Sequence, residues 1–250
     1  MSHVVLCGAT DGIGLALARL YAARGWHVGI LGRDPAKLES VSAELRAAGG
    51  TIATARCDVL DQDLAAEGFA VVLRTLGGMD LFVYCAGVLH HAEGAHTDAV
   101  ADRETMEVNA TGAVHLLGLA ADHFQLAWRG HIAAIGSVAG DRGRKGNPAY
   151  GASKAALHTY LEGLRNRLHP FGVRVTTVKP GFVRTRMLAG HGGPATEWPA
   201  GSISVEEAAR LIARGLDRGR EVFYVPWWWE VVAFAVRHTP RFVFKRLGPP

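Results

Sequence analysis

The sequence contains little cysteine and none of the spacings expected for a disulfide framework or a zinc site. Its three cysteines, Cys7, Cys57 and Cys85, lie far apart in a chain of 250 residues, whereas both kinds of site use closely spaced sets. We expect them to be small buried apolar residues in a reducing compartment. Hydrophobic residues make up 49% of the chain, and a chain of this length can form a core without covalent staples.

A secretory signal is also missing, because residues 3–7 lead directly into a glycine turn without a longer apolar segment. Cations and anions are nearly balanced along the chain, except near its C-terminal end, where cations are in excess. The formal net charge is +4, and residues 237–246 carry four cations and no acid. Without that segment the charges cancel, which argues against a nucleic-acid surface on the body of the protein. We expect a cytoplasmic protein without a nucleic-acid partner.

Short β-branched runs alternate with amphipathic stretches, which predicts repeated βα units and a parallel sheet. The expected strands lie near residues 3–7, 27–31, 51–55, 80–84, 131–136, 173–178 and 221–225. The expected helices lie near 12–24, 35–48, 61–76, 98–127 (broken or bent), 148–169 and 204–217. We predict an α/β fold, one doubly wound seven-strand sheet with helices on both faces, over residues 1–225. An apolar and basic tail, 226–250, follows without forming a domain, and the long connection 189–202 is expected to be a functional lid.

The first predicted strand leads through a glycine-rich turn into a helix, which favours a dinucleotide site. Glycine lets the backbone approach a pyrophosphate, and the helix N-terminus stabilises the negative charge. The candidate cofactor residues of this turn are Gly8, Thr10, Asp11, Gly12, Ile13 and Gly14. Arg33 ends the second strand, where an arginine favours the 2′-phosphate of NADP. Asp34 keeps NAD possible, because it is either a ribose ligand or only a helix cap.

Further candidate residues follow other predicted strands at the same edge of the sheet. Asp58 and Val59 follow the third strand, and Cys85, Ala86 and Gly87 follow the fourth. We expect a bound dinucleotide to run along this edge.

Tyr150 and Lys154 are four residues apart on a predicted helix and therefore share a face. An ammonium near a phenol lowers the pKa of the phenol from about 10, which makes it a usable acid or base near neutrality. Ser137 ends the fifth strand and is placed to hold a substrate carbonyl. Asn109 falls within the long helical region, where an amide is locally unfavourable and indicates a kink or a special role.

In their order and spacing these motifs resemble the short-chain dehydrogenase/reductase family over residues 3–225. The resemblance implies a nicotinamide-dependent oxidoreductase that forms a homodimer or homotetramer. It implies that Tyr150 is the general acid, that Lys154 lowers its pKa and binds the nicotinamide ribose, and that Ser137 positions the carbonyl. Asn109 would hold a water in a proton relay. After Pro180 and Gly181, Val183 and Thr185 would meet the nicotinamide carboxamide. One departure is Cys85, where the family commonly has asparagine.

Three stretches, 137–157, 172–187 and 236–247, further resemble the keto-reductases of the decaprenylphosphoryl-arabinose pathway, which reduce a lipid-linked keto sugar. We therefore expect an NADP(H)-preferring carbonyl reductase acting on a lipid-linked keto sugar or another amphiphilic ketone. A reductase of 3-oxoacyl, steroid or small soluble ketones is the alternative enzyme. A dinucleotide-binding sensor or scaffold without turnover is the alternative from another class, although it would need no proton relay.

Two remaining features have competing interpretations. The tail combines Trp227–Trp229 with later cations and suits a helix at the inner face of a membrane, or it covers the core or a subunit interface. It is too short and too charged to span a bilayer. His90, His91, Glu93 and His96 form a cluster without the spacing of a metal site, and we expect no metal there.

Overall fold

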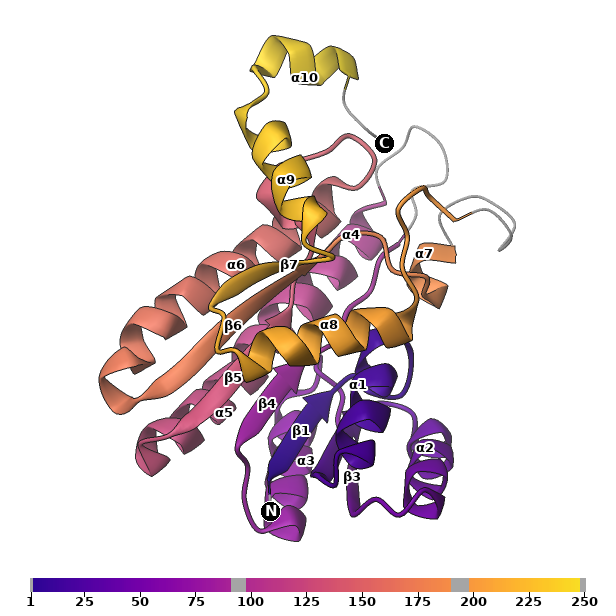
Figure 1. Ribbon diagram of the computed structural model, residues 1–250, viewed down its shortest axis with the longest axis vertical. Coiled ribbons are helices and arrows are strands. Elements are labelled where there is room, and N and C mark those ends of the chain that lie inside the picture. The colour runs from indigo at the N-terminus through magenta and orange to yellow at the C-terminus, as the bar shows by residue number, and fades with distance from the viewer. Residues whose placement is uncertain (1, 91–97, 190–197, 248–250) are drawn as a thin grey trace.

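The computed structural model describes residues 2–90, 98–189 and 198–247, and it confirms the predicted doubly wound sheet (Figure 1). Seven parallel strands lie in the order β3-β2-β1-β4-β5-β6-β7. Their bounds are β1 His3–Cys7, β2 His27–Gly32, β3 Ile52–Arg56, β4 Leu81–Tyr84, β5 Gly130–Ile135, β6 Val173–Pro180 and β7 Val222–Val225. The order reverses between β1 and β4, and ligands of such sheets bind beside the carboxyl ends of the strands at this point.

Helices cover both faces of the sheet, and each face has its own apolar core. Val4 and Leu6 of β1 pack with α1 (Gly12–Ala23), α2 (Pro35–Ala47) and α8 (Val205–Asp217). Val5 and Cys7 point to the opposite face, because side chains alternate along a strand. There they pack with α3 (Gln62–Leu76), α5 (Gly112–Ala127) and α6 (Pro148–Leu168). The two cores hold the strand ends, and hence the site, in place.

The long helical region predicted over 98–127 is interrupted, as expected. It consists of α4 (Ala99–Met106), a π-helical turn η1 (Glu107–Thr111) and α5. Asn109 lies in the π turn. A π turn inserts an extra residue into a helix and is frequent at functional sites.

The predicted helix starts at 35 and 204 have the expected caps. The Asp34 carboxylate accepts hydrogen bonds from the backbone N–H groups of Ala36 and Lys37 at 3.0 and 3.3 Å. The Ser204 hydroxyl accepts one from Glu207 N–H at 3.1 Å. Each cap satisfies backbone donors that the first helical turn leaves free.

The tail forms two helices, α9 (Trp228–His238) and α10 (Arg241–Leu247), which project beyond the carboxyl ends of the strands (Figure 1). Trp229 and Ala233 are buried against Val138 and Tyr224. Arg142 donates hydrogen bonds to the Val236 carbonyl and, at 2.7 Å, to the Thr239 carbonyl. One face of α9 therefore packs on the body of the protein. No helix among the described residues is long and apolar enough to cross a membrane.

Candidate active site

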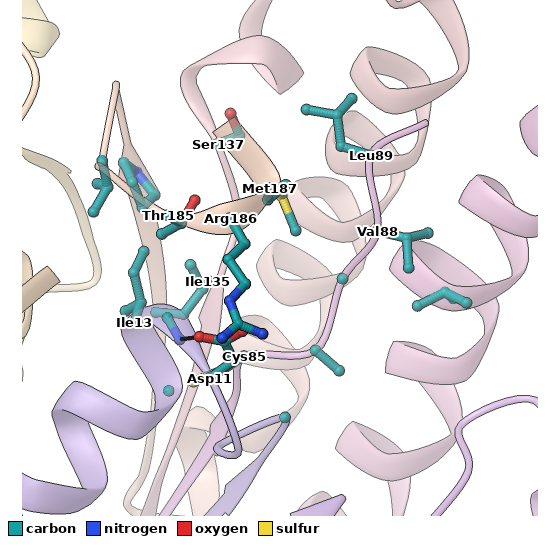
Figure 2. Close-up of a pocket in the computed structure, with 18 of the residues that line it drawn as sticks. Asp11, Ile13, Cys85, Val88, Leu89, Ile135, Ser137, Thr185, Arg186 and Met187 are labelled. Carbon is teal, nitrogen blue, oxygen red and sulfur yellow. Dashed lines mark hydrogen bonds and ion pairs between the residues drawn. The ribbon is translucent and has the colours of Figure 1, made fainter. Parts of the chain in front are cut away.

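A cavity of about 780 Å³ lies at the carboxyl ends of the strands (Figure 2). It is bounded by the turn after β1, the segment after β4, the start of α6 and the segment after β6. Every cofactor and catalytic residue predicted from the sequence lines it except Asn109. Figure 2 shows Asp11 and Ile13 on the glycine-turn side, with Val88 and Leu89 on another wall and Arg186 reaching toward Asp11.

The glycine turn forms a cradle with no room for side chains. Gly8 has φ +78°, and a Cβ there would lie 2.5 Å from Ala86 N; one on Gly14 would lie 2.2 Å from Gly8 O. Gly12 has φ +55°, a conformation that favours glycine. The turn delivers the chain into α1, whose N-terminus carries free N–H groups and a partial positive charge. These residues fit the pyrophosphate of a dinucleotide.

Arg33 and Lys37 form an exposed cationic pair of side chains at the end of β2, and both line the cavity. Neither side chain has a hydrogen bond or ion pair with another described residue, so both are available to a phosphate. Oδ1 of Asp34 accepts the capping hydrogen bonds of α2, so the helix-cap alternative is present in the structure, and a ribose role for this carboxylate stays untested. The sequence analysis did not identify Lys37 as a cofactor residue. Its side chain reaches the cavity at the end of β2 only because the first turn of α2 brings it there.

Asp58 and Val59 line the cavity beyond β3. The Asp58 carboxylate accepts a hydrogen bond from Leu60 N–H at 3.1 Å, which fixes the turn. A Cβ on Gly112 would lie 2.7 Å from Val59 O, so the start of α5 approaches this turn closely. Backbone and carboxylate oxygens here are placed to accept hydrogen bonds from a base.

Asn109 is fully buried behind the cavity and braces its wall. Its Oδ1 accepts from Val88 N–H at 2.8 Å, and its Nδ2 donates to Val88 O at 2.9 Å and to Ser153 Oγ at 3.1 Å. Both N–H donors of the amide and one acceptor position of Oδ1 therefore face the segment after β4 or helix α6. This clamp accounts for an amide inside a helix, and the role in a proton relay stays a prediction.

Ser137, from the N-cap of η2, and Tyr150 and Lys154, both on α6, line the cavity together. Ser137 caps the 3-10 helix η2 (Val138–Asp141) by accepting from Ala139 N–H at 3.1 Å. Lys154, on α6, donates to Ile135 O at 3.1 Å and lies 5.7 Å from the centre of the Tyr150 ring. Tyr150 lines the same cavity as Ser137, whose hydroxyl acts to lower the pKa of Tyr150. A phenol, a hydroxyl and an ammonium thus converge as the sequence predicted.

The pKa of Tyr150 differs from the expectation. Burial raises the pKa of Tyr150 above its ordinary 10.0, and the hydrogen bond to Ser137 acts in the opposite direction. Burial also lowers the pKa of Lys154 to about 8, while Cys85 acts to raise it. The Lys154 ammonium donates to the Ile135 carbonyl and lies 5.7 Å from the Tyr150 ring centre, so desolvation outweighs its charge in setting the pKa of Tyr150. The phenol therefore keeps its proton at neutral pH.

Cys85 stands where the resembled family commonly has asparagine, and it is half-buried and lines the cavity. Burial raises the pKa of Cys85 to about 12, with Lys154 acting in the opposite direction. Its backbone N–H donates to Cys7 O at 2.8 Å, which continues the pairing of β1 with β4. The thiol is therefore neutral, and the backbone geometry at this position does not depend on an amide side chain.

A buried polar cluster beneath Ser137 was not visible in the sequence. Ser137 N–H donates to His158 Nε2 at 3.4 Å. Asp141 accepts from Lys179 Nζ at 2.5 Å and from the Tyr224 hydroxyl at 2.8 Å. Burial lowers the pKa of His158 to about 3, so its ring is neutral and can accept. The cluster joins η2, α6, β6 and β7 and fixes the strand end that carries Ser137.

The segment after β6 completes the cavity. Trp229 of α9 packs so closely on Gly181 that a Cβ there would lie 1.9 Å from the indole nitrogen. Val183 forms a single bridge with Ile203, and Thr185 approaches Gly12. The segment thus lies against the glycine turn. The resemblance places the nicotinamide beside Val183 and Thr185 of this segment.

The histidine cluster and the proposed lid fall largely outside the described residues. His91, Glu93 and His96 lie there, as do residues 190–197 of the connection. His90 Nε2 lies 3.1 Å from a carboxylate oxygen of Glu104. Among the described residues no group of three or more His, Cys, Asp or Glu side chains is placed to hold a metal ion.

Comparisons with known proteins agree with this geometry. A model described as short chain dehydrogenase matches residues 2–192. An oxidoreductase of Mycobacterium tuberculosis, described as uncharacterized, is 35% identical over 246 residues, which cover 98% of this chain and 96% of the relative. Another from Myxococcus xanthus is 34% identical over 223 residues, 89% of this chain and 87% of the relative.

Two solved structures are similar over nearly the whole chain. A short-chain dehydrogenase from Sphingobium yanoikuyae in complex with NADPH has a TM-score of 0.82 and 26% identity, covering 94% of this chain and 93% of that one. A variant of the actinorhodin polyketide ketoreductase with NADPH has a TM-score of 0.81 and 26% identity, covering 91% and 97%.

Proposed function

The chain belongs to the short-chain dehydrogenase family and is an NAD(P)-dependent oxidoreductase, and from this premise we propose that it reduces a ketone with NADPH. One observation carries the proposal: Tyr150, Ser137, Lys154 and the glycine cradle line one cavity, with Lys154 Nζ 5.7 Å from the centre of the Tyr150 ring. A general acid must hold its proton before it can donate it. The phenol of Tyr150 holds its proton at neutral pH, as a donor to a carbonyl oxygen must.

Each group of described residues has a separate role in this reaction. The cradle around Gly8, Gly12 and Gly14 would hold the pyrophosphate, and the bound NADPH supplies the hydride. Ser137 orients the carbonyl oxygen, and Tyr150 donates its hydroxyl proton to the oxygen as negative charge develops there. Lys154 places a positive charge close to the phenol and favours departure of that proton. The Asn109 clamp keeps the wall beside Gly87 in position.

The cationic pair at the β2 end supports NADPH over NADH. An arginine fork matches a phosphate, and Lys37 adds a second charge. We expect Arg33→Ala to weaken NADPH binding by about 2 kcal/mol, near the low end for a truncated charge pair, because the site is exposed and Lys37 remains. NADH binding should be nearly unchanged. Titration of both cofactors into both proteins measures this, and equal affinities for NADPH and NADH in the unmodified protein would contradict the assignment.

The favoured substrate is an amphiphilic ketone, with a lipid-linked keto sugar as the first class to test. Beyond Tyr150 the cavity is lined mainly by apolar side chains; they include Val88, Leu89, Val138, Phe182, Met187 and Leu188. Apolar walls of this kind bind alkyl or isoprenoid groups and exclude water.

Oxidation of NADPH, followed over a panel of ketones with and without detergent-dispersed lipid-linked keto sugars, tests both levels of the proposal. Turnover of the lipid-linked ketones above the soluble ones is the expected result. Turnover of 3-oxoacyl or other soluble ketones alone would leave a ketone reductase and remove the lipid-linked class. Absence of turnover on every ketone, with NADPH bound, would overturn the proposed reaction.

We also propose that the tail rests on an anionic membrane surface and brings the enzyme to such a substrate. The face of α9 away from the body exposes large apolar side chains: Trp227 is 69% exposed, Val231 62%, Phe234 59% and Phe242, on α10, 67%. The cations Arg237, Arg241, Lys245 and Arg246 lie on the same two helices. Apolar side chains beside cations suit the interface of an anionic membrane.

Neutralising these four cations together, each to glutamine, should weaken binding to phosphatidylserine vesicles markedly, since each cation contributes roughly 1 kcal/mol near an anionic surface. Sedimentation with vesicles measures the binding, and neutral phosphatidylcholine vesicles are the matched control. Activity on a small soluble ketone should survive, because no described part of α9 or α10 lines the cavity. Absence of vesicle binding by the parent protein, or loss of a homo-oligomer in the variant, would make the tail a subunit contact instead.

A further inference from the structure

A cation of the cavity, Arg144, has a buried nitrogen without a partner among the described residues. Arg144 lies in the connection between η2 and α6, six residues before Tyr150, and lines the same cavity as Ser137 and Tyr150. Its Nε is buried and has no hydrogen-bond partner. No ion pair or hydrogen bond joins its side chain to another described residue. A buried guanidinium nitrogen left unpaired is costly, so this position suits an anionic partner.

The nearby acid is already engaged. Asp141 acts to raise the pKa of Arg144, but burial has the larger effect and lowers it. Both carboxylate oxygens of Asp141 are held by other groups, Oδ1 by Lys179 and Oδ2 by Tyr224. Asp141 therefore contributes charge at a distance and no direct hydrogen bond.

The acids that line the cavity lie at its other end. Among the described lining residues they are Asp11, Asp34 and Asp58. Asp11 caps the start of α1, and the other two follow β2 and β3, so all three belong to the cofactor end. The lining that Arg144 shares also includes apolar side chains, Val138 and Phe182 among them. An apolar wall lowers the local dielectric and strengthens attraction between the guanidinium and an anion.

We propose that Arg144 binds an anionic group of the ketone substrate, a phosphate or a carboxylate, and thereby selects anionic ketones. The planar guanidinium pairs two N–H donors with two oxygens of either group. This inference rests on the proposed reduction of a ketone and deepens it, because it names the charge that the substrate carries. An amphiphilic substrate would place its anion at Arg144 and its apolar part against the neighbouring walls.

Three matched probes separate the contributions: 4-acetylbenzoate, 4-acetylphenyl phosphate and the neutral methyl ester of 4-acetylbenzoate. Each is titrated into the NADPH complex by calorimetry, and NADPH oxidation is followed in parallel. Arg144→Gln should weaken binding of the anionic probes about ten- to a hundredfold, as expected for hydrogen bonds to a charged group. Binding of the methyl ester and of NADPH should not change. The larger loss, for carboxylate or for phosphate, identifies which anion the site prefers.

The control is Lys145→Gln, which removes a neighbouring exposed cation that does not line the cavity; it should leave all three affinities unchanged. Arg144→Lys keeps the charge without the fork and should restore part of the affinity. Equal effects of Arg144→Gln on anionic and neutral probes, or no binding of either anionic probe to the parent protein, would overturn the anion site. Binding that follows the expected pattern without NADPH oxidation would keep the anion site and count against ketone reduction.

Discussion

Tyr150→Phe should lower turnover by about a hundred- to ten-thousandfold, the contribution of a positioned proton donor, while NADPH affinity changes little. The substitution removes one hydroxyl and keeps the ring that packs beside Lys154. It also removes the interaction of the hydroxyl with Ser137, which costs roughly 1 kcal/mol and leaves the fold intact. Initial rates with saturating NADPH measure turnover, and fluorescence titration measures cofactor binding.

Tyr160→Phe is the matched control for this change. Tyr160 also lies on α6, but its hydroxyl donates to Val114 O at 3.3 Å and it does not line the cavity. This variant should turn over like the parent protein. Near-parental turnover in the Tyr150 variant would show that Tyr150 is not the proton donor. Equal losses in both variants would show that a phenol hydroxyl on α6 acts through stability.

The strands and most helices could be predicted from local patterns because each element is specified by its own period and caps. Asp34 and Ser204 show this directly, since both cap helices where the sequence placed them. The interruption of the helix around Asn109 was also expected, from one unfavourable amide. Its cause is tertiary, however: the amide clamps Val88 and Ser153, residues that approach it only in the folded chain.

The parts of the site that the sequence did not reveal depend on burial and on distant partners. The pKa of Tyr150 was expected to be lowered by Lys154, yet burial raises it. Arg144 looks like an ordinary loop cation until its Nε is found buried without a partner. The cluster of Asp141, Lys179 and Tyr224 joins residues up to 83 positions apart, which no local pattern connects.

Lys154→Met should impair both turnover and NADPH affinity, because the ammonium serves two partners in the proposed site. Methionine has a similar volume but neither charge nor donor, so the Ile135 carbonyl loses the hydrogen bond it accepts at 3.1 Å. Removing a buried ammonium relieves desolvation, which offsets the roughly 1–3 kcal/mol cost of an unpaired carbonyl. The melting temperature should therefore change little while activity falls, and that separation distinguishes a role in the reaction from a structural one.

The dependence of the reduction rate on pH tests whether the charge of Lys154 takes part in the reaction. Burial lowers the pKa of Lys154 to about 8, so its charge is lost as pH rises through that value. In the parent protein the rate of ketone reduction should fall above about pH 8, because the positive charge beside the phenol disappears. Lys154→Met has no charge to lose, so its low rate should not show that fall. Lys145→Met, at an exposed position, should keep the parental profile. A parental profile in Lys154→Met, or unchanged NADPH affinity together with unchanged turnover, would assign the pH dependence to another group and remove Lys154 from the reaction.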